Sequence, residues 1–146
     1  MNNSDVVVVS ALLPATPESV FNAWIDPVQL SNWWGAGPEF STGVVEVDPR
    51  PGGSYRLGMI ASSGAEYIAT GQYTEFEPGR KLSFSWRWEH SDESFPTTRI
   101  EVSFEAAEQG CRVEIRHHSL PDAAQRNSHE DGWKGCLQSL NSCIAS

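Results

Sequence analysis

The sequence has few cysteines and few basic residues. Only three cysteines, Cys111, Cys136 and Cys143, occur in 146 residues, and none has the C-x-x-C spacing of a redox or zinc motif. We therefore predict buried thiols, with no disulfide framework, no metal site and no cofactor. Ten Lys and Arg against 19 Asp and Glu give a formal net charge of −9, which argues against nucleic acid or an anionic membrane as a partner.

Long apolar runs are also missing. No run approaches the roughly 18 residues of a membrane span, and the first residues have no basic stretch followed by an apolar core. We therefore expect a cytoplasmic protein without a membrane segment. The length of 146 residues fits one domain, residues 1–146, that folds without disulfides or metal. No G-x-G-x-x-G or phosphate loop indicates a nucleotide-binding α/β fold.

The strongest helical pattern lies at the C-terminus. Six apolar residues recur there on one helical face: Trp133, Cys136, Leu137, Leu140, Cys143 and Ile144. This periodicity predicts a helix over 128–144, with Ser128 as its N-cap, long enough at about 1.5 Å per residue to cross a sheet. Near the N-terminus, Thr16-Pro17 and Asp26-Pro27 each predict the start of a short helix.

Most of the remaining chain has the alternation of β-strands. The predicted strands cover 6–13, 42–48, 54–60, 66–76, 81–88, 97–105 and 111–118. The β-branched run at 6–13 predicts a strand with both faces covered at least in part, Gly71 predicts a bulge or bend, and a polar loop is expected over 90–96. The order of the elements predicts an α+β fold, an antiparallel meander with its helices on one side.

The sequence is rich in tryptophan, with six residues, four of them in the pairs Trp33-Trp34 and Trp86-x-Trp88. If the sheet curls around the terminal helix, Trp86, Trp88 and Trp133 converge on one interior together with other apolar side chains, and Trp33 and Trp34 lie near its rim. Two interpretations remain open at this point. The aromatic residues could simply fill the core, or they could line a small-molecule pocket.

Four motifs together resemble a known family. In order, they are Asp26-Pro27-x-x-Leu30-x-x-Trp33-Trp34-Gly35, Asp48-Pro-Arg-Pro-Gly-Gly-Ser-Tyr55, Gly71-x-Tyr73-x-Glu75-x-x-Pro78-x-x-x-Leu82-x-Phe84-x-Trp86 and His129-x-x-Gly132-Trp133-x-x-x-Leu137-x-x-Leu140. They are similar to the family named after the C-terminal domain of the activator of the heat shock protein 90 ATPase, within the START and Bet v 1-like superfamily. The resemblance implies a helix-grip fold, in which a curved antiparallel sheet wraps a C-terminal helix and a cavity between them often holds an apolar ligand. The family name also implies a link to the stress response.

We accordingly predict a protein that binds a small hydrophobic molecule beneath its C-terminal helix. In this hypothesis Trp86 and Trp133 form a wall, and Tyr55 and His117 orient the ligand by polar contacts. The lid is formed by Trp33, Trp34 and Phe40. The full set of predicted ligand-binding residues is Trp33, Trp34, Phe40, Tyr55, Leu57, Met59, Phe84, Trp86, Trp88, Phe104, His117, Trp133 and Leu137.

A cavity enzyme of the cyclase or hydrolase type is an alternative, although the sequence leans away from it. No catalytic constellation is evident, and we predict no catalytic residue. His117 and His118 point to opposite faces of a strand, so they cannot bind one metal ion together, and His129 is expected to cap the terminal helix locally. An inward-facing carboxylate beside His117 or Tyr55 would favour an enzyme; the facing of Glu46, Glu66 and Glu75 is open.

A third alternative is a chaperone partner, as the family name suggests. We consider it the weaker one, because the expected single domain has no separate chaperone-binding domain and its predicted outward faces are mixed and polar. The sequence also leaves open a homodimer in which a second subunit covers the Trp33-Trp34 region.

Overall fold

The computed structural model describes residues 6–89 and 96–145, so nearly all of the loop predicted over 90–96 lies outside the described residues. The elements in chain order are β1 (Val7–Leu13), α1 (Pro17–Ile25), α2 (Pro27–Trp33), β2 (Phe40–Val47), β3 (Ser54–Ala61), β4 (Glu66–Glu77), β5 (Lys81–Trp88), β6 (Thr98–Ala107), β7 (Gly110–His118) and α3 (Ala123–Ala145). Within the described residues, none of these helices is both long and apolar enough to cross a membrane.

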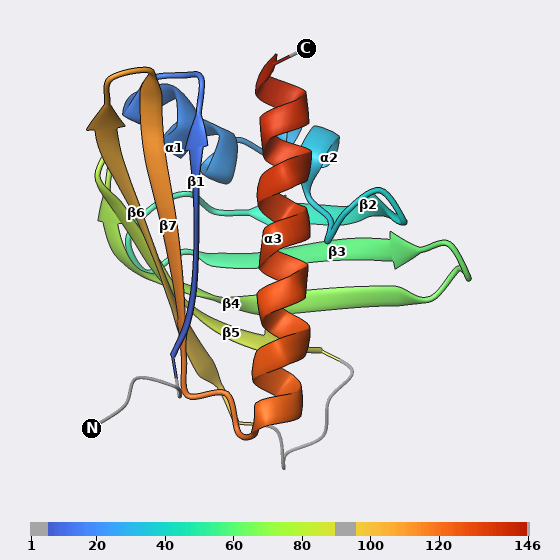
Figure 1. Cartoon of the computed structure of the whole chain (residues 1–146). Coiled ribbons are helices and arrows are strands. Elements are labelled where there is room, and N and C mark those ends of the chain that lie inside the picture. Colours follow the sequence, from blue (N-terminus) through green and yellow to red (C-terminus); the bar gives the residue numbers. More distant parts are fainter. Residues whose placement is uncertain (1–5, 90–95, 146) are drawn as a thin grey trace.

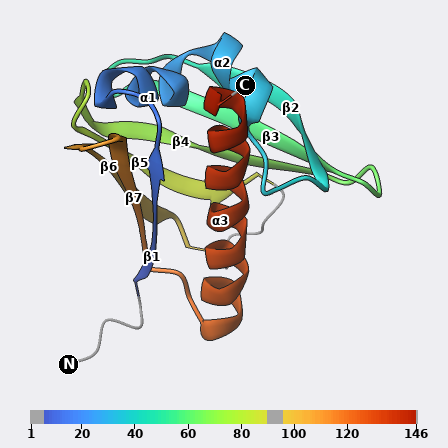
Figure 2. The ribbon, with the colours of Figure 1, turned by 45° about the horizontal axis from the view of Figure 1, so that its top comes forward.

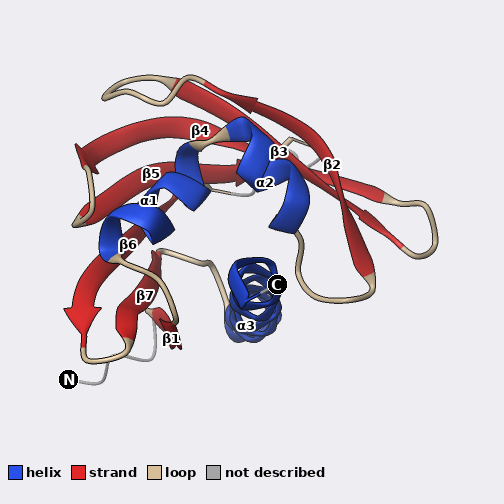
Figure 3. Cartoon of the chain, turned by 90° about the horizontal axis from the view of Figure 1, so that it is seen from above, coloured by secondary structure: helices blue, strands red, loops and turns tan. Residues whose placement is uncertain are grey.

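One antiparallel sheet of seven strands, in the order β1-β7-β6-β5-β4-β3-β2, forms the framework. Strands β2 to β7 follow one another as a meander, and β1 returns to pair with β7. The sheet curves around α3, and all three helices lie on its concave side (Figures 1 and 3). The predicted α+β helix-grip architecture is confirmed.

The two short helices begin where the sequence predicts. The hydroxyl of Thr16 accepts a hydrogen bond from the backbone N–H of Ser19 at 3.2 Å, and Oδ1 of Asp26 accepts one from the backbone N–H of Val28 at 3.0 Å. A proline follows each cap at the first helical position. Both helices lie near the C-terminal end of α3 (Figures 1 and 2), where they help to close one end of the curved sheet.

The long helix α3 begins earlier than predicted. Its first residue is Ala123, and Asp122 Oδ1 accepts a hydrogen bond from the backbone N–H of Gln125 at 2.8 Å. The assignment of Ser128 as the N-cap is therefore wrong, because Ser128 lies inside the helix. The predicted apolar face is confirmed over its central part, where the buried side chains are Trp133, Cys136, Leu137 and Leu140.

Strand β1 differs from the prediction in its outer face. Val7, Val9 and Leu13 point inward and are buried, but Val8 and Leu12 are 46% and 62% exposed. The outer face is less covered than the prediction of at least partial cover on both faces implied, because β1 is an edge strand of the sheet and the helices all pack on the concave side (Figure 3). The β-branched run reflects strand propensity and not burial on two sides.

Gly71 has a different role from the one predicted. The irregularity in the pairing of β4 with β5 falls between Tyr73 and Glu75, beyond this glycine. A Cβ atom on Gly71 would lie 1.9 Å from the carbonyl oxygen of Ser85, so the glycine permits a close approach of two backbones. The same carbonyl accepts a hydrogen bond from the Tyr55 hydroxyl at 2.6 Å.

Candidate functional site

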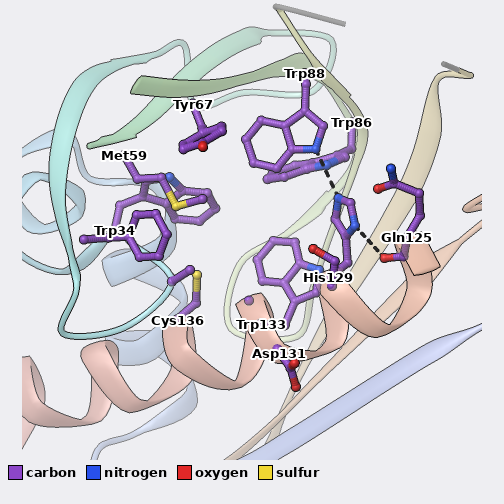
Figure 4. Close-up of a pocket in the computed structure, with 14 residues that line it drawn as sticks. Trp34, Met59, Tyr67, Trp86, Trp88, Gln125, His129, Asp131, Trp133 and Cys136 are labelled. Atoms are coloured by element: carbon purple, nitrogen blue, oxygen red, sulfur yellow. Dashed lines mark hydrogen bonds between the residues drawn. The ribbon is translucent and has the colours of Figure 1, made fainter. Parts of the chain in front are cut away.

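A pocket of about 590 Å³ lies between the first half of α3 and the concave face of the sheet. Strands β2 to β5 and the segment after α2 supply one side of it, and α3 supplies the other (Figure 4). The residues that line the pocket are Trp34, Ala36, Phe40, Met59, Tyr67, Trp86, Trp88, Gln125, Ser128, His129, Asp131, Gly132, Trp133 and Cys136.

Aromatic rings in mutual contact form the floor of this pocket. The ring centroids of Trp34, Trp86 and Trp133 lie 5.2 to 6.1 Å apart, and each of these residues is at most 4% exposed. The ring centroid of Trp88 lies 5.1 Å from that of Trp86 and 6.3 Å from that of Tyr67, which extends the cluster along the sheet. The pocket is therefore an aromatic hollow.

His129 holds the edge of this hollow together. Its Nε2 accepts a hydrogen bond from the indole N–H of Trp88 at 3.1 Å, and its Nδ1 donates to the carbonyl of Gln125 at 2.8 Å (Figure 4). This pair of contacts requires the neutral imidazole with its proton on Nδ1. Burial lowers the pKa of His129, which favours the same neutral form, although the hydrogen bond to Gln125 opposes this effect.

A second histidine supports the floor from below. His117 is fully buried, and its Nδ1 accepts a hydrogen bond from the indole N–H of Trp133 at 3.1 Å. Its Nε2 then donates to the Thr98 hydroxyl at 2.8 Å, and that hydroxyl donates to the carbonyl of Trp86 at 3.1 Å. Burial, with the neighbouring His129 and His118 adding to it, lowers the pKa of His117 to about 2. The chain of hydrogen bonds fixes two of the floor tryptophans.

The remaining polar lining is sparse and comes mainly from α3. Gln125 is half-buried, Ser128 and Asp131 are exposed, and none of the described lining residues is Lys or Arg. Burial raises the pKa of the Cys136 thiol to about 12, so this side chain is an uncharged wall group. The buried indole N–H of Trp86 has no hydrogen-bond partner in the described part of the chain.

The structure brings six of the thirteen predicted ligand-binding residues to this pocket. They are Trp34, Phe40, Met59, Trp86, Trp88 and Trp133. The other seven lie in the core outside the lining: Trp33, Tyr55, Leu57, Phe84, Phe104, His117 and Leu137. Among these, Trp33 donates its indole N–H to the carbonyl of Ala23, and Tyr55 and His117 use their polar atoms within the protein. Tyr55 and His117 are thus supports of the fold and not polar groups presented in the pocket.

Several lining residues were not in the predicted set. Gln125, Ser128, Asp131 and Gly132 belong to the first half of α3, whose start was placed too late in the sequence. His129 was predicted as a local cap, but it lies in the second turn and faces the rings. Ala36, Tyr67 and Cys136 complete the group; the alternation of β4 could have identified Tyr67, while Ala36 has no such signal.

The carboxylates with undetermined facing all lie away from the pocket. Glu46 pairs with Arg56, Glu75 pairs with Lys81, and Glu66 is exposed. His117 and His118 lie on opposite faces as predicted, and His118 contacts Glu101 at 2.7 Å on the outer face. Among the described residues, no group of three or more His, Cys, Asp or Glu is placed to hold a metal ion. The pocket therefore offers shape and aromatic surface more than reactive groups.

Comparison with protein families agrees with this architecture. The sequence matches the family described as "Activator of Hsp90 ATPase homolog 1-like protein" over residues 14–145. The chain belongs to this AHSA1-like family. The motifs that resembled it in the sequence lie within the matched region, and the helix-grip fold of the family is the one observed.

Solved structures of other AHSA1-like and related proteins have the same fold. Protein CV1439 from Chromobacterium violaceum is 26% identical, with a TM-score of 0.85 over 97% of this chain and 98% of that one. The AHSA1 protein from Silicibacter pomeroyi is 24% identical (TM-score 0.82; 96% and 97% covered), and the AHSA1-like protein from Aeromonas hydrophila is 23% identical (TM-score 0.78; 96% and 92% covered). A comparison with curated proteins finds no match.

Proposed function

We propose that this protein binds a small hydrophobic ligand in the pocket between α3 and the curved sheet. Membership of the AHSA1-like family supports, in general terms, a domain that binds a ligand or a partner. The observation that carries the finer proposal is the aromatic hollow of about 590 Å³, which lies within the range of about 300 to 1,000 Å³ typical of ligand pockets.

The polar contacts of the pocket favour binding over catalysis. Both histidines near the hollow already use their ring nitrogens in hydrogen bonds to tryptophan, backbone or Thr98. The Cys136 thiol is protonated, and the three carboxylates discussed above face outward. An enzyme would need a general base, a nucleophile and an oxyanion donor within reach of one another. The groups just described do not make up such a set.

A protein partner is less well supported than a small ligand. The large apolar side chains that are exposed in the described residues are Val8, Leu12 and Val28. Val8 and Leu12 lie on the outer face of β1, and Val28 lies on α2, so they do not form the broad apolar patch that commonly marks a docking surface.

Gly132 allows the pocket to be filled without disturbing the core. A Cβ atom at this position would have the Cβ of Ala36 as its nearest neighbour, at 3.9 Å, and the residue faces the hollow. We expect N-phenyl-1-naphthylamine, an uncharged fluorescent probe, to bind the native protein saturably with one site. Gly132→Leu should abolish this binding, whereas the matched control Gly132→Ala should retain it.

The same titration can contradict the proposal. Probe fluorescence that rises without saturation in the native protein would indicate that the hollow binds nothing specifically. Equal binding by the native protein and the folded Gly132→Leu variant would place the probe elsewhere. Circular dichroism and thermal unfolding of both variants establish that the fold is retained.

A further inference from the structure

The described lining of the pocket contains no positively charged group. Its basic side chain is His129, which is neutral in its hydrogen-bonding arrangement and directs Nε2, a lone-pair acceptor, to Trp88. The one acidic side chain in the described lining is Asp131, which is exposed at the rim and directed away from the rings (Figure 4). A ligand anion would thus enter the hollow without meeting an opposite charge.

The start of α3 does not supply a compensating anion site. The first turn of a helix normally attracts anions through its free N–H groups. Here the side chain of Asp122 already accepts a hydrogen bond from the backbone N–H of Gln125, and it adds a negative charge at that end. A buried carboxylate or phosphate without a partner carries a large desolvation penalty, so the site disfavours both.

The rings provide a surface of the opposite kind. Aromatic faces carry the negative part of the ring quadrupole and attract organic cations, and tryptophan attracts them more strongly than tyrosine or phenylalanine does. The rings of Trp34, Trp86 and Trp133 are inclined to one another by 53° to 74°, and Tyr67 and Trp88 by 75°. All five of these residues line the pocket, so a guest in the hollow contacts aromatic surface from several directions.

We propose that the pocket selects a ligand whose inserted end is an organic cation, such as a methylated ammonium group, and that it excludes anionic ligands. This inference rests on the proposed function and adds the charge of the ligand to it. The aromatic rings hold the cation by cation–π attraction, and the apolar remainder of the ligand fills the rest of the hollow. The formal charge of −9 on the whole chain acts in the same direction, because it attracts cations to the protein.

Three probes of equal shape test the charge directly. Benzyltrimethylammonium, neopentylbenzene and phenylmethanesulfonate share a benzyl group and a tetrahedral head, but their charges are positive, zero and negative. Quenching of tryptophan fluorescence measures their affinities, with free tryptophan amide as the optical control. We expect the cation to bind on the order of tenfold more tightly than the neutral probe, and the anion to show no saturable binding.

Variants of the ring wall test the source of this preference. Trp88 and Tyr67 are half-buried, so Trp88→Leu and Tyr67→Leu keep an apolar wall without removing a fully buried ring. Each folded variant should lose most of the preference for the cation while its affinity for neopentylbenzene changes less than about threefold. Lys134→Ala, on the exposed side of α3, is the matched control and should leave all affinities unchanged.

Each outcome separates this inference from the proposal on which it rests. Neutral binding as tight as, or tighter than, cation binding would overturn the charge preference while supporting a hydrophobic pocket. Saturable binding of the sulfonate at comparable affinity would also overturn it. If none of the three probes binds and N-phenyl-1-naphthylamine does not bind either, the ligand-binding function itself fails. An unchanged cation preference in both leucine variants would refute the role of the rings.

Discussion

His117 is an uncharged imidazole in the core, and acidification tests this arrangement. Above pH 6.5, the ordinary pKa of histidine, neither the folded nor the unfolded chain carries a proton there. Below that pH the unfolded chain binds the proton, but the native chain does not until about pH 2. The native state is therefore expected to lose stability as the pH falls below 6.5, by about 1.4 kcal/mol for each pH unit.

The magnitude can be measured above the range in which most carboxylates titrate. Between pH 6.5 and about pH 5, the loss attributable to His117 is about 2 kcal/mol. Urea denaturation followed by tryptophan fluorescence at several pH values gives this slope. In His117→Gln, an amide can accept from Trp133 and donate to Thr98 without titrating, so the slope should fall by about 1.4 kcal/mol per pH unit.

The comparison needs a control on the other face of the strand. His118→Gln changes the neighbouring histidine, which contacts Glu101 on the outer surface, and should keep the part of the slope that comes from His117. His129 is also held neutral and contributes in the same direction, so some slope is expected to remain in His117→Gln. Equal slopes for the native protein and His117→Gln would refute the reasoning.

Variants on α3 and β1 test the packing by urea denaturation. Gly135→Ala places a Cβ 1.9 Å from the carbonyl oxygen of Ala36 and should lower the free energy of unfolding by about 1–3 kcal/mol. Gly132→Ala meets no such contact and should raise it by about 0.5–1 kcal/mol. Equal effects of the two substitutions would contradict this distinction. Trp133→Phe leaves a buried imidazole acceptor unpaired and should cost about 1–3 kcal/mol, so a neutral result would exclude a contribution from that hydrogen bond. Leu12→Ser, on the exposed face of β1, should change stability by less than about 0.5 kcal/mol. Leu13→Ala removes a side chain that is 2% exposed and should cost about 2–5 kcal/mol. A larger loss in Leu12→Ser than in Leu13→Ala would refute the assigned facing of β1.

Most of the architecture could be predicted because its signals are local. Alternation along β5 identified the whole strand Lys81–Trp88, and the Thr16-Pro17 and Asp26-Pro27 pairs located two helix starts. The start of α3 was missed because residues 123–128 carry almost no apolar period, so only the chemistry of Asp122 marks that end.

The candidate site was harder to predict, because facing inward does not decide which inward residues border a hollow. Tyr55 and Trp86 both point into the interior, yet Tyr55 is covered by neighbours and Trp86 lines the pocket. The contact between Trp88 and His129 depends on how α3 crosses the sheet, and no local pattern encodes that crossing. Single positions such as Ala36 enter the lining only through the three-dimensional path of a loop.

The pairing of β1 with β7 has a consequence for the synthesis of the chain. Val7 lies opposite His117 and Leu13 opposite Cys111, so β1 must wait for its pairing partner until the five intervening strands and β7 itself have been synthesised. During that interval the inward residues Val7 and Val9 have no β7 and no α3 to cover them. An apolar, strand-forming segment held open in this way is vulnerable to association with other nascent chains, so we expect the interval between the synthesis of β1 and that of β7 to be the stage at which this protein most needs protection.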